Sequence, residues 1–297
     1  MSFDFTPLNS LHDEWQSLQP LKPEDEARLW QKLRLEWNYH SNHIEGNTLT
    51  YGETSLLLFH DRTTGNHIFR EYLEMKAHDV AIGYVRQLAA DPSRMITEAD
   101  IRDLNQIILK EPFWKEAITP DGQPTRREIT PGQYKTAPNH VRTATGEMFY
   151  FATVEDTPPK MRALAEWLHQ ALQSPALHPV EIAAKLHHDF VIIHPFDDGN
   201  GRVARLLVNY ILQRSGYLPI IVRTEDKAQY LTALGLADAG DLEPLTEYLS
   251  KATLVSLELG IRTARGQPID ISCTLPHRPP HRTTEEWMRE LREGDSD

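Results

Sequence analysis

The stretch HPFDDGNGRVAR, residues 194–205, joins two segments that each carry a helical pattern of apolar residues. The first segment ends at His194, because the residue before a proline is pushed away from helical geometry. After the Gly-Asn-Gly turn, apolar residues recur at i, i+3, i+4, i+7 and i+8, which is one face of a helix: Val203, Leu206, Leu207, Tyr210 and Ile211. The sequence therefore predicts a helix–loop–helix unit that contains no strand.

The loop of this unit has the features of an anion site. Backbone N–H groups converge at the start of a helix, and the helix dipole adds partial positive charge there. Gly199 and Gly201 let the backbone approach a phosphate closely. Arg202 and Arg205 lie three positions apart, so both lean over one side of the first turn, and their guanidinium groups match phosphate oxygens. We therefore expect the loop to bind phosphate groups.

Two more side chains of the stretch supply chemistry. Asp198 is a candidate ligand for Mg²⁺, which typically takes one or two carboxylates plus phosphate oxygens. His194 is a candidate general base, because its unperturbed pKa lies near neutrality. A single His-Pro pair, a single Gly-Asn-Gly turn or two helical arginines are usually structural features. Their combination in one stretch indicates a functional site.

The stretch also matches a known signature, His-x-Phe-x-(Asp/Glu)-Gly-Asn-Gly-Arg-x-x-Arg, at every fixed position. On these residues the chain resembles the Fic family. Residues 177–181 before the stretch, and Gly216-Tyr217 and Pro219 after it, fit the same family. The resemblance covers about residues 25–255 and is most specific over 177–219. It implies an all-α fold, a Fic helical bundle with a small β-hairpin flap.

The resemblance implies transfer of AMP from ATP to a protein hydroxyl. His194 would take the proton from a Ser, Thr or Tyr hydroxyl of a target protein, or of the chain itself. The hydroxyl would attack the α-phosphorus of ATP, and pyrophosphate would leave. Asp198 would hold Mg²⁺ against the phosphates. The other implied nucleotide-binding residues are Gly199, Asn200 and Gly201 as the anion hole, Arg202 and Arg205 on the β- and γ-phosphates, and Tyr230 near the nucleotide.

Other activities remain open at this point. Phosphorylating Fic relatives called Doc carry lysine at the second motif glycine, so Gly201 favours AMP transfer over phosphoryl transfer. The alternatives are an enzyme that removes AMP, a catalytically quiet nucleotide-binding regulator, and transfer of another nucleotide such as UMP. The last alternative stays open because the anion loop recognises phosphates rather than the base.

A second segment, Ser41-Asn42-His43-Ile44-Glu45-Gly46, resembles the Fic inhibitory motif (Ser/Thr)-x-x-x-Glu-(Gly/Asn). Ser41 and Glu45 share one helix face. An acid in the last helical turn opposes the helix dipole by about 0.3–1 kcal/mol, which suggests that Glu45 has a partner. The resemblance implies that this partner is Arg205, so that ATP binds non-productively. The alternative is an ordinary surface glutamate beside the C-cap glycine Gly46.

A third segment, residues 132–152, is expected to be the family's flap. Such a hairpin aligns the target by pairing with it as a strand. The aromatic run at its end, Met148-Phe149-Tyr150-Phe151, supplies candidates that face the nucleotide or the target, above all Phe149 and Tyr150. The alternative is that these side chains pack on the core.

The remaining pattern divides the chain into four parts. We expect an N-terminal arm (1–22), a helical region (23–110) with the inhibitory helix at about 24–45, a catalytic core (111–255), and a C-terminal helix end with a flexible tail (256–297). Helices are expected over 53–90, 97–110, 159–173, 179–192, 202–215, 225–238 and 241–264, with one short helix at 283–293 in the tail.

Composition restricts location and partners. The chain of 297 residues has a formal charge of −12, which argues against broad binding to nucleic acid. A single cysteine excludes an intramolecular disulfide and a cysteine-rich metal site. Neither a signal-peptide pattern nor a membrane-length apolar run is present, so we expect a cytoplasmic protein. A homodimer through residues 53–90 is a further expectation.

Overall fold

The computed structural model describes residues 3–118, 123–142, 148–174 and 176–269. Over this range the chain is mainly helical, which confirms the expected all-α class. The helices are α1 (Thr6–Ser17), α2 (Pro23–Ile44), α3 (Tyr51–His60), α4 (Phe69–Ala90), α5 (Glu98–Leu109), α6 (Thr157–Gln173), α7 (Pro179–Ile193), α8 (Asn200–Arg214), α9 (Lys227–Asp238) and α10 (Glu243–Ala264). The strands form two antiparallel hairpins, β1 (Phe113–Ile118) with β2 (Pro124–Ile129), and β3 (Val141–Arg142) with β4 (Met148–Phe149).

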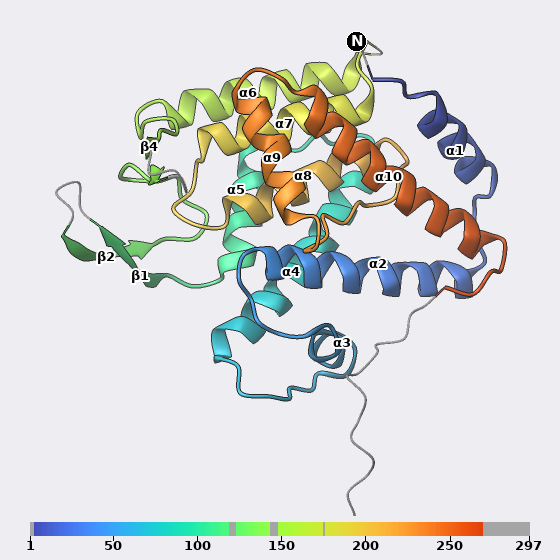
Figure 1. Cartoon of the computed structure of the whole chain (residues 1–297), viewed down its shortest axis with the longest axis horizontal. Coiled ribbons are helices and arrows are strands. Elements are labelled where there is room, and N and C mark those ends of the chain that lie inside the picture. The colour runs from blue at the N-terminus through green and yellow to red at the C-terminus, as the bar shows by residue number, and fades with distance from the viewer. Residues whose placement is uncertain (1–2, 119–122, 143–147, 175, 270–297) are drawn as a thin grey trace, which may run out of the picture.

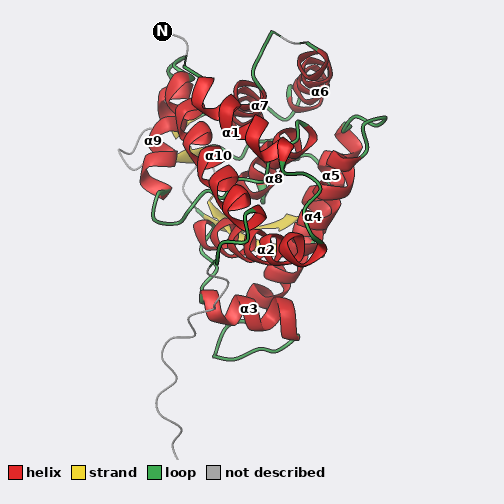
Figure 2. Cartoon of the chain, turned by 90° about the vertical axis from the view of Figure 1, so that its right-hand side faces the viewer, coloured by secondary structure: helices red, strands yellow, loops and turns green. Residues whose placement is uncertain are grey.

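Helix α8 is the centre of the bundle. Figures 1 and 2 show it between α2 and α4 on one side and α6 and α7 on the other. Its residues are buried from Arg202 to Leu212, including Leu206, Tyr210 and Ile211, which are fully buried. A helix that is buried all round is held by packing on every face. The first turn of α8 is therefore fixed in position by the whole core.

The N-terminal arm contains a helix that its weak periodicity did not indicate. Helix α1 covers Thr6–Ser17 and buries Leu8 and Trp15. It packs on α10, where a Cβ added to Gly260 would lie 2.9 Å from Trp15 Cζ3. Helix α1 is held by only two buried side chains, Leu8 and Trp15, and by the contact of Trp15 with Gly260. The sequence of α1 therefore shows no regular apolar stripe.

The helical region expected over 53–90 is two helices rather than one. A reciprocal capping box between Thr50 and Glu53 starts α3, and Asp61 ends it in the left-handed conformation, with φ 50°. Residues 61–68 then lead into α4. The five helices expected after residue 158 are present as α6 to α10, with ends within two residues of the predicted ones.

The structure has one more hairpin than we expected. β3–β4 lies inside the predicted flap of 132–152, of which residues 143–147 lie outside the described residues. β1–β2 precedes it, with a register that runs from Phe113 opposite Ile129 to Ile118 opposite Pro124. The helix expected at 283–293 and the tail around it also lie outside the described residues.

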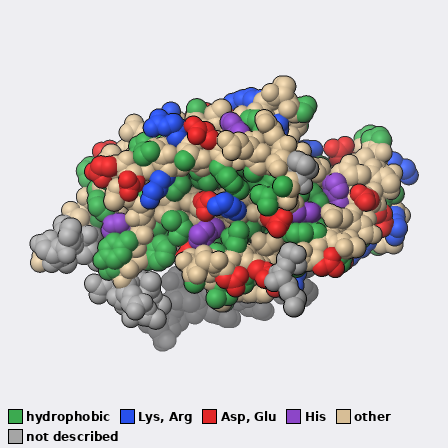
Figure 3. Space-filling view, turned by 90° about the horizontal axis from the view of Figure 1, so that it is seen from above, with side chains coloured by type: hydrophobic (Ala, Val, Ile, Leu, Met, Phe, Trp, Pro, Cys, Tyr) green, Lys and Arg blue, Asp and Glu red, His purple; other side chains and the backbone are tan. Residues whose placement is uncertain are grey.

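The surface carries both signs of charge. On the face in Figure 3, basic and acidic side chains are interspersed, and the described residues of this face form no single basic patch. Over the described ranges, none of the helices has the length and apolar character needed to cross a bilayer.

Candidate active site

The loop between α7 and α8 is built on two left-handed residues. His194 caps α7 with φ 48°, and its N–H donates to Phe190 O at 2.9 Å. Gly199 caps the start of α8 with φ 80°, and a Cβ there would lie 2.9 Å from Ile108 Cδ1. The glycine is therefore required by both conformation and space. Because α8 begins at Asn200, the backbone N–H groups of its first turn belong to the Gly-Asn-Gly turn itself.

Side-chain amides hold this turn from inside. Asn200 Nδ2 donates to Phe196 O at 2.7 Å, and Phe196 N donates to Asn200 Oδ1 at 3.0 Å. From α5, Asn105 Nδ2 donates to Asp198 O at 2.8 Å. The amide of Asn200 is therefore engaged within the loop, which leaves its backbone N–H as the group available to an anion.

His194 lies under the end of the flap. The ring of Phe151 stacks on its imidazole with ring centroids 3.9 Å apart. Burial, and next the charge of Lys135, lower the pKa of His194 to about 4. The imidazole is therefore neutral near pH 7, which is the state that accepts a proton.

Arg205 is buried, and its Nε and Nη2 donate to residues at the end of α2. Its Nη2 lies 2.7 Å from Glu45 Oε1 and 2.9 Å from Ser41 O, and its Nε lies 3.1 Å from Ser41 Oγ. Burial alone would raise the pKa of Glu45, but the charge and hydrogen bond of Arg205 lower it below its usual value. The structure thus brings together Ser41, Glu45 and Arg205. Gly46, the residue after Glu45, has φ 97°, which is incompatible with continuing helix α2.

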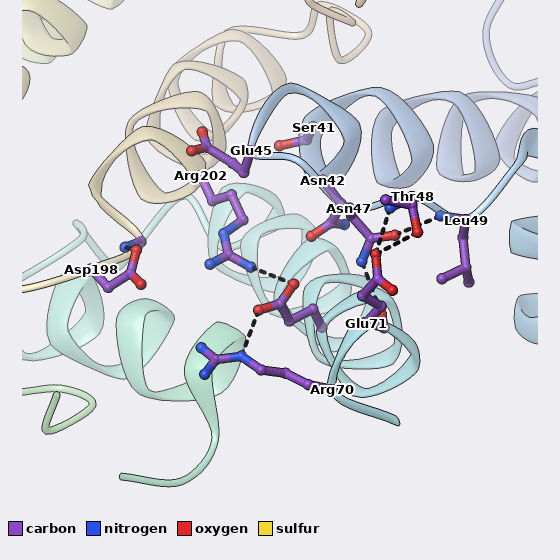
Figure 4. Close-up of polar contacts among 12 residues, drawn as sticks. Ser41, Asn42, Glu45, Asn47, Thr48, Leu49, Arg70, Glu71, Asp198 and Arg202 are labelled. Carbon is purple, nitrogen blue, oxygen red and sulfur yellow. Dashed lines mark hydrogen bonds and ion pairs between the residues drawn. The ribbon is translucent and has the colours of Figure 1, made fainter. Parts of the chain in front are cut away.

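The Glu45 carboxylate also covers the loop backbone. It points from the end of α2 toward the first turn of α8 (Figure 4). A Cβ added to Gly201 would lie 2.5 Å from Glu45 Oε1. The carboxylate therefore occupies the place over Gly201 where the predicted anion hole opens.

Arg202 is buried like Arg205 but has weaker contacts. Its Nη1 lies 4.0 Å from Glu74 Oε2 on α4, and Glu74 Oε1 accepts from Arg70 Nε at 3.0 Å (Figure 4). The guanidinium of Arg70 in turn lies 3.4 Å from the centre of the Phe113 ring. Sequence reasoning did not select Glu74, since no short motif connects α4 with α8.

The unexpected hairpin supplies cations to the two aspartates of the loop. Lys115 Nζ on β1 lies 3.0 Å from Asp198 Oδ2, and Arg127 on β2 pairs with Asp197. Burial raises the pKa of Asp198, but the charges of Lys115 and Arg202 lower it below its usual value, so the group is a carboxylate.

The donor set around Asp198 fits a metal that arrives with phosphates. The described residues contain no group of three or more His, Cys, Asp or Glu that could hold an ion alone. Mg²⁺ typically keeps waters and uses one or two carboxylates together with substrate phosphates. Asp198, beside an anion loop, fits that pattern.

Two predicted tyrosines lie against histidines. Tyr230 on α9 is 2% exposed, and its hydroxyl lies 2.6 Å from His187 Nε2. Tyr230 also interacts with the buried Arg205. Tyr150 is 68% exposed and meets the edge of His140. Phe149 contacts Phe151 edge to face, at 5.1 Å between centroids. Of the four aromatic and apolar candidates in the flap, Phe151 is therefore the one in contact with His194.

The chain resembles known proteins over most of its length. The model of the Fic/DOC family matches residues 95–212. A crystal structure of a Fic domain-containing signalling protein from Bacteroides thetaiotaomicron is 43% identical, with a TM-score of 0.83, over 90% of this chain and 100% of that one. Fic-1 from Caenorhabditis elegans is 27% identical, with a TM-score of 0.71, over 87% of this chain and 72% of that one.

Curated relatives agree with this. A protein from Nematostella vectensis named "Protein adenylyltransferase Fic" is 33% identical over 72% of this chain and 46% of its own length. The chain spans about half the length of the curated relatives it matches. The complete motif, the helical bundle and a relative of 43% identity that is covered in full together show that this chain belongs to the Fic/DOC family.

Proposed function

We propose that this chain is a protein adenylyltransferase that moves AMP from ATP to a Ser, Thr or Tyr hydroxyl of a target protein and of itself. The observation that carries the proposal is the neutral imidazole of His194 beside an anion loop that is flanked by Arg202 and Arg205. The name of the Nematostella relative, a protein adenylyltransferase, supports the same activity.

The reaction follows from this arrangement. The hydroxyl oxygen of the target attacks the α-phosphorus of ATP and gives its proton to His194. The bond between the α-phosphorus and the bridging oxygen breaks, and pyrophosphate leaves with the bond electrons. Backbone N–H groups of the loop, with Arg202 and Arg205, hold the phosphate oxygens and offset the charge that develops on them. Mg²⁺ held by Asp198 would supply further charge neutralisation on the phosphates.

We also propose that the chain inhibits itself through Glu45. With Glu45 in place, Arg205 donates to Glu45 and Ser41, and the carboxylate stands over Gly201. The γ-phosphate of ATP and this carboxylate are both negative, so they compete for the same guanidinium group. ATP bound beside Glu45 would then hold its α-phosphorus away from the incoming hydroxyl.

Label transfer from radiolabelled ATP tests both proposals. We expect Glu45→Gly to raise self-labelling about tenfold or more, since ~1.4 kcal/mol of contact energy corresponds to a factor of ten. Adding His194→Ala should lower the rate at least ~10²-fold, the typical contribution of a general base. Glu225→Gly, which removes an exposed glutamate from a loop, is the matched control.

The outcomes separate the proposals. Equal labelling by wild type and Glu45→Gly would remove the inhibitory role of Glu45. If the protein with both Glu45→Gly and His194→Ala labels as fast as Glu45→Gly alone, His194 is not the general base and the proposed mechanism is wrong. The same assay with UTP, GTP and CTP decides the nucleotide, and loss of label from modified protein decides whether AMP is also removed.

The partners remain part of the proposal. An extended target segment would pair with the β3–β4 hairpin as a strand, next to His194. A second copy of the chain would dock through residues 53–90, where Ile68 and Phe69 are exposed. Sedimentation of a Phe69→Asp variant tests that dimer. The cytoplasm is the location we propose.

A further inference from the structure

The backbone carbonyls around His194 are held by the stem of the flap. Helix ends leave their last carbonyls without partners inside the helix. Here each of five consecutive carbonyls, Ile192 to Phe196, accepts a hydrogen bond from one of three residues at the two ends of the flap: Lys135, Asn139 and Ala152. Phe196 O also accepts from Asn200 Nδ2, within the loop itself.

Lys135 contributes two of these bonds. Its backbone N–H donates to Pro195 O at 2.8 Å, and its ammonium donates to Ile193 O at 3.0 Å. The same ammonium donates to Asn139 Oδ1 at 3.0 Å, which orients the amide of Asn139. Lys135 is only 2% exposed. A buried ammonium is costly unless it is hydrogen-bonded, and a cation at a helix C-terminus is favoured by the dipole.

Asn139 contributes the bonds that surround the proline. Its Nδ2 donates to His194 O at 3.0 Å and to Phe196 O at 2.9 Å. At the other end of the flap, Ala152 N donates to Ile192 O at 3.2 Å. Ala152 is the residue after Phe151, whose ring stacks on the His194 imidazole. Both ends of the flap are thus tied to the loop that carries His194.

These hydrogen bonds stabilise a backbone conformation of His194 that is unfavourable on its own. His194 has φ 48°, a left-handed conformation that a non-glycine residue adopts only when its surroundings determine it. The carbonyls before, at and after this residue are held by hydrogen bonds from Lys135 and Asn139: Ile193 O, His194 O and Pro195 O. The direction of the imidazole follows from that backbone.

We propose that Lys135 and Asn139 are positioning residues for His194. They set the place and direction of its imidazole by binding the carbonyls of its loop, without contact to the nucleotide or the target. The inference rests on the proposed function, in which His194 takes the proton of the attacking hydroxyl. A displacement of a catalytic group by about 1 Å can cost ~10²-fold in rate.

The charge of Lys135 adds a second effect that can be measured separately. The charged groups that act on His194 are Lys135 from the flap stem, Asp198 from its own loop and Glu45 from α2. Those that act on Lys135 are Asp197, Arg127 and Lys160. Removing the ammonium takes a positive charge away from the imidazole, so the protonated form becomes easier to make and the pKa of His194 rises.

The test uses variants in the Glu45→Gly background, so that the brake is absent from every protein compared. Asn139→Asp keeps the shape but replaces two N–H donors with an acceptor that faces two carbonyl oxygens. Asn209→Asp is its matched control, because Asn209 is a buried amide whose Nδ2 donates to a backbone carbonyl, that of Ile220, and none of its hydrogen bonds is to the His194 loop. Lys160→Met is the control for Lys135→Met, since Lys160 is half exposed on α6.

We expect Asn139→Asp to lower kcat about 10²-fold, while the ATP dissociation constant from calorimetry changes less than about threefold. Asn209→Asp should lower Tm without that loss of kcat. Lys135→Met should lower kcat and move the acid limb of the pH–rate profile to higher pH. NMR titration of the His194 ring should show the same upward shift of its pKa in Lys135→Met and none in Lys160→Met.

The outcomes distinguish this inference from the proposed function. If the parent Glu45→Gly protein transfers no label, the proposed function fails, and the NMR titration still tests whether Lys135 acts on His194. If the parent transfers label and Asn139→Asp matches it in kcat, or loses only stability as Asn209→Asp does, the positioning role is overturned. An unshifted His194 titration in Lys135→Met overturns the role of its ammonium.

Discussion

Arg205 and Arg202 stand three residues apart on the first two turns of α8, both almost completely buried, but their partners differ. Arg205 donates to Ser41 and Glu45 through bonds of 2.7 to 3.1 Å. Arg202 faces Glu74 at 4.0 Å, and its Nε has no hydrogen-bond partner among the described residues. A guanidinium that donates to a carboxylate must give up that bond to bind phosphate. The proposed inhibition therefore acts chiefly through Arg205, which bonds Glu45, while Arg202 acts on Glu45 only through its charge.

Replacing each arginine by alanine tests the difference between them most directly, and it is expected to give the largest effect. Arg205→Ala should lower the free energy of unfolding by about 2 kcal/mol, because it leaves Glu45 and the Ser41 carbonyl without their donor. The loss stays below that of a fully buried pair, since the Glu45 side chain is 38% exposed. Arg202→Ala should cost less than about 1 kcal/mol. Urea denaturation measures both.

The double variant Glu45→Ala with Arg205→Ala is the control for this prediction. It should recover part of the loss, because no unpaired carboxylate remains. Equal losses for Arg205→Ala and Arg202→Ala would mean that the two arginines are held alike, and the comparison would fail.

A smaller effect is expected in the pH dependence of the stability that Glu45 contributes. Because the folded-state pKa of Glu45 is lowered by Arg205 against the cost of burial, its stabilisation is complete above the unfolded carboxyl pKa. It is lost as pH falls through the lowered folded value. The stability difference between wild type and Glu45→Gln, about 1 kcal/mol near neutrality, should therefore shrink on acidification. Thermal unfolding across pH measures it, with exposed Glu225→Gln as control.

The smallest effect is expected at Glu74. Its contact with Arg202 is long, so Glu74→Gln should change the free energy of unfolding by less than about 0.5 kcal/mol. The ATP dissociation constant, measured by calorimetry in the Glu45→Gly background, should change less than about threefold. A tenfold gain of ATP affinity would show that Glu74 competes for Arg202 as Glu45 competes for Arg205, and a tenfold loss would show that Glu74 orients Arg202 for ATP; either result would contradict this prediction.

The sequence was informative where chemistry and local geometry coincide. Gly199, Asn200 and the apolar face of α8 predict the loop and the buried helix behind it, because conformation and periodicity are local properties. The approach of Glu45 to Arg205 spans 160 positions, and only the resemblance to a family indicated it.

Other parts of the site could not be predicted from local pattern. Hairpin β1–β2 had a turn signal in Asp121-Gly122, but its charged strands lack a buried face, since Trp114 and Lys115 are exposed. The contacts of Lys135 and Asn139 are made to backbone carbonyls, which every residue carries. A side chain that binds backbone leaves no complementary residue to find in the sequence.

The pairing of Lys115 with Asp198 leaves neither oxygen of this carboxylate without a partner. One carboxylate oxygen already faces an ammonium at 3.0 Å, and the other accepts from Gly199 N. Under the proposed function, Mg²⁺ at Asp198 would have to displace the Lys115 ammonium, whose side chain is 55% exposed. Until then, this ion pair and the Gly199 N–H keep the carboxylate charge compensated at the start of α8.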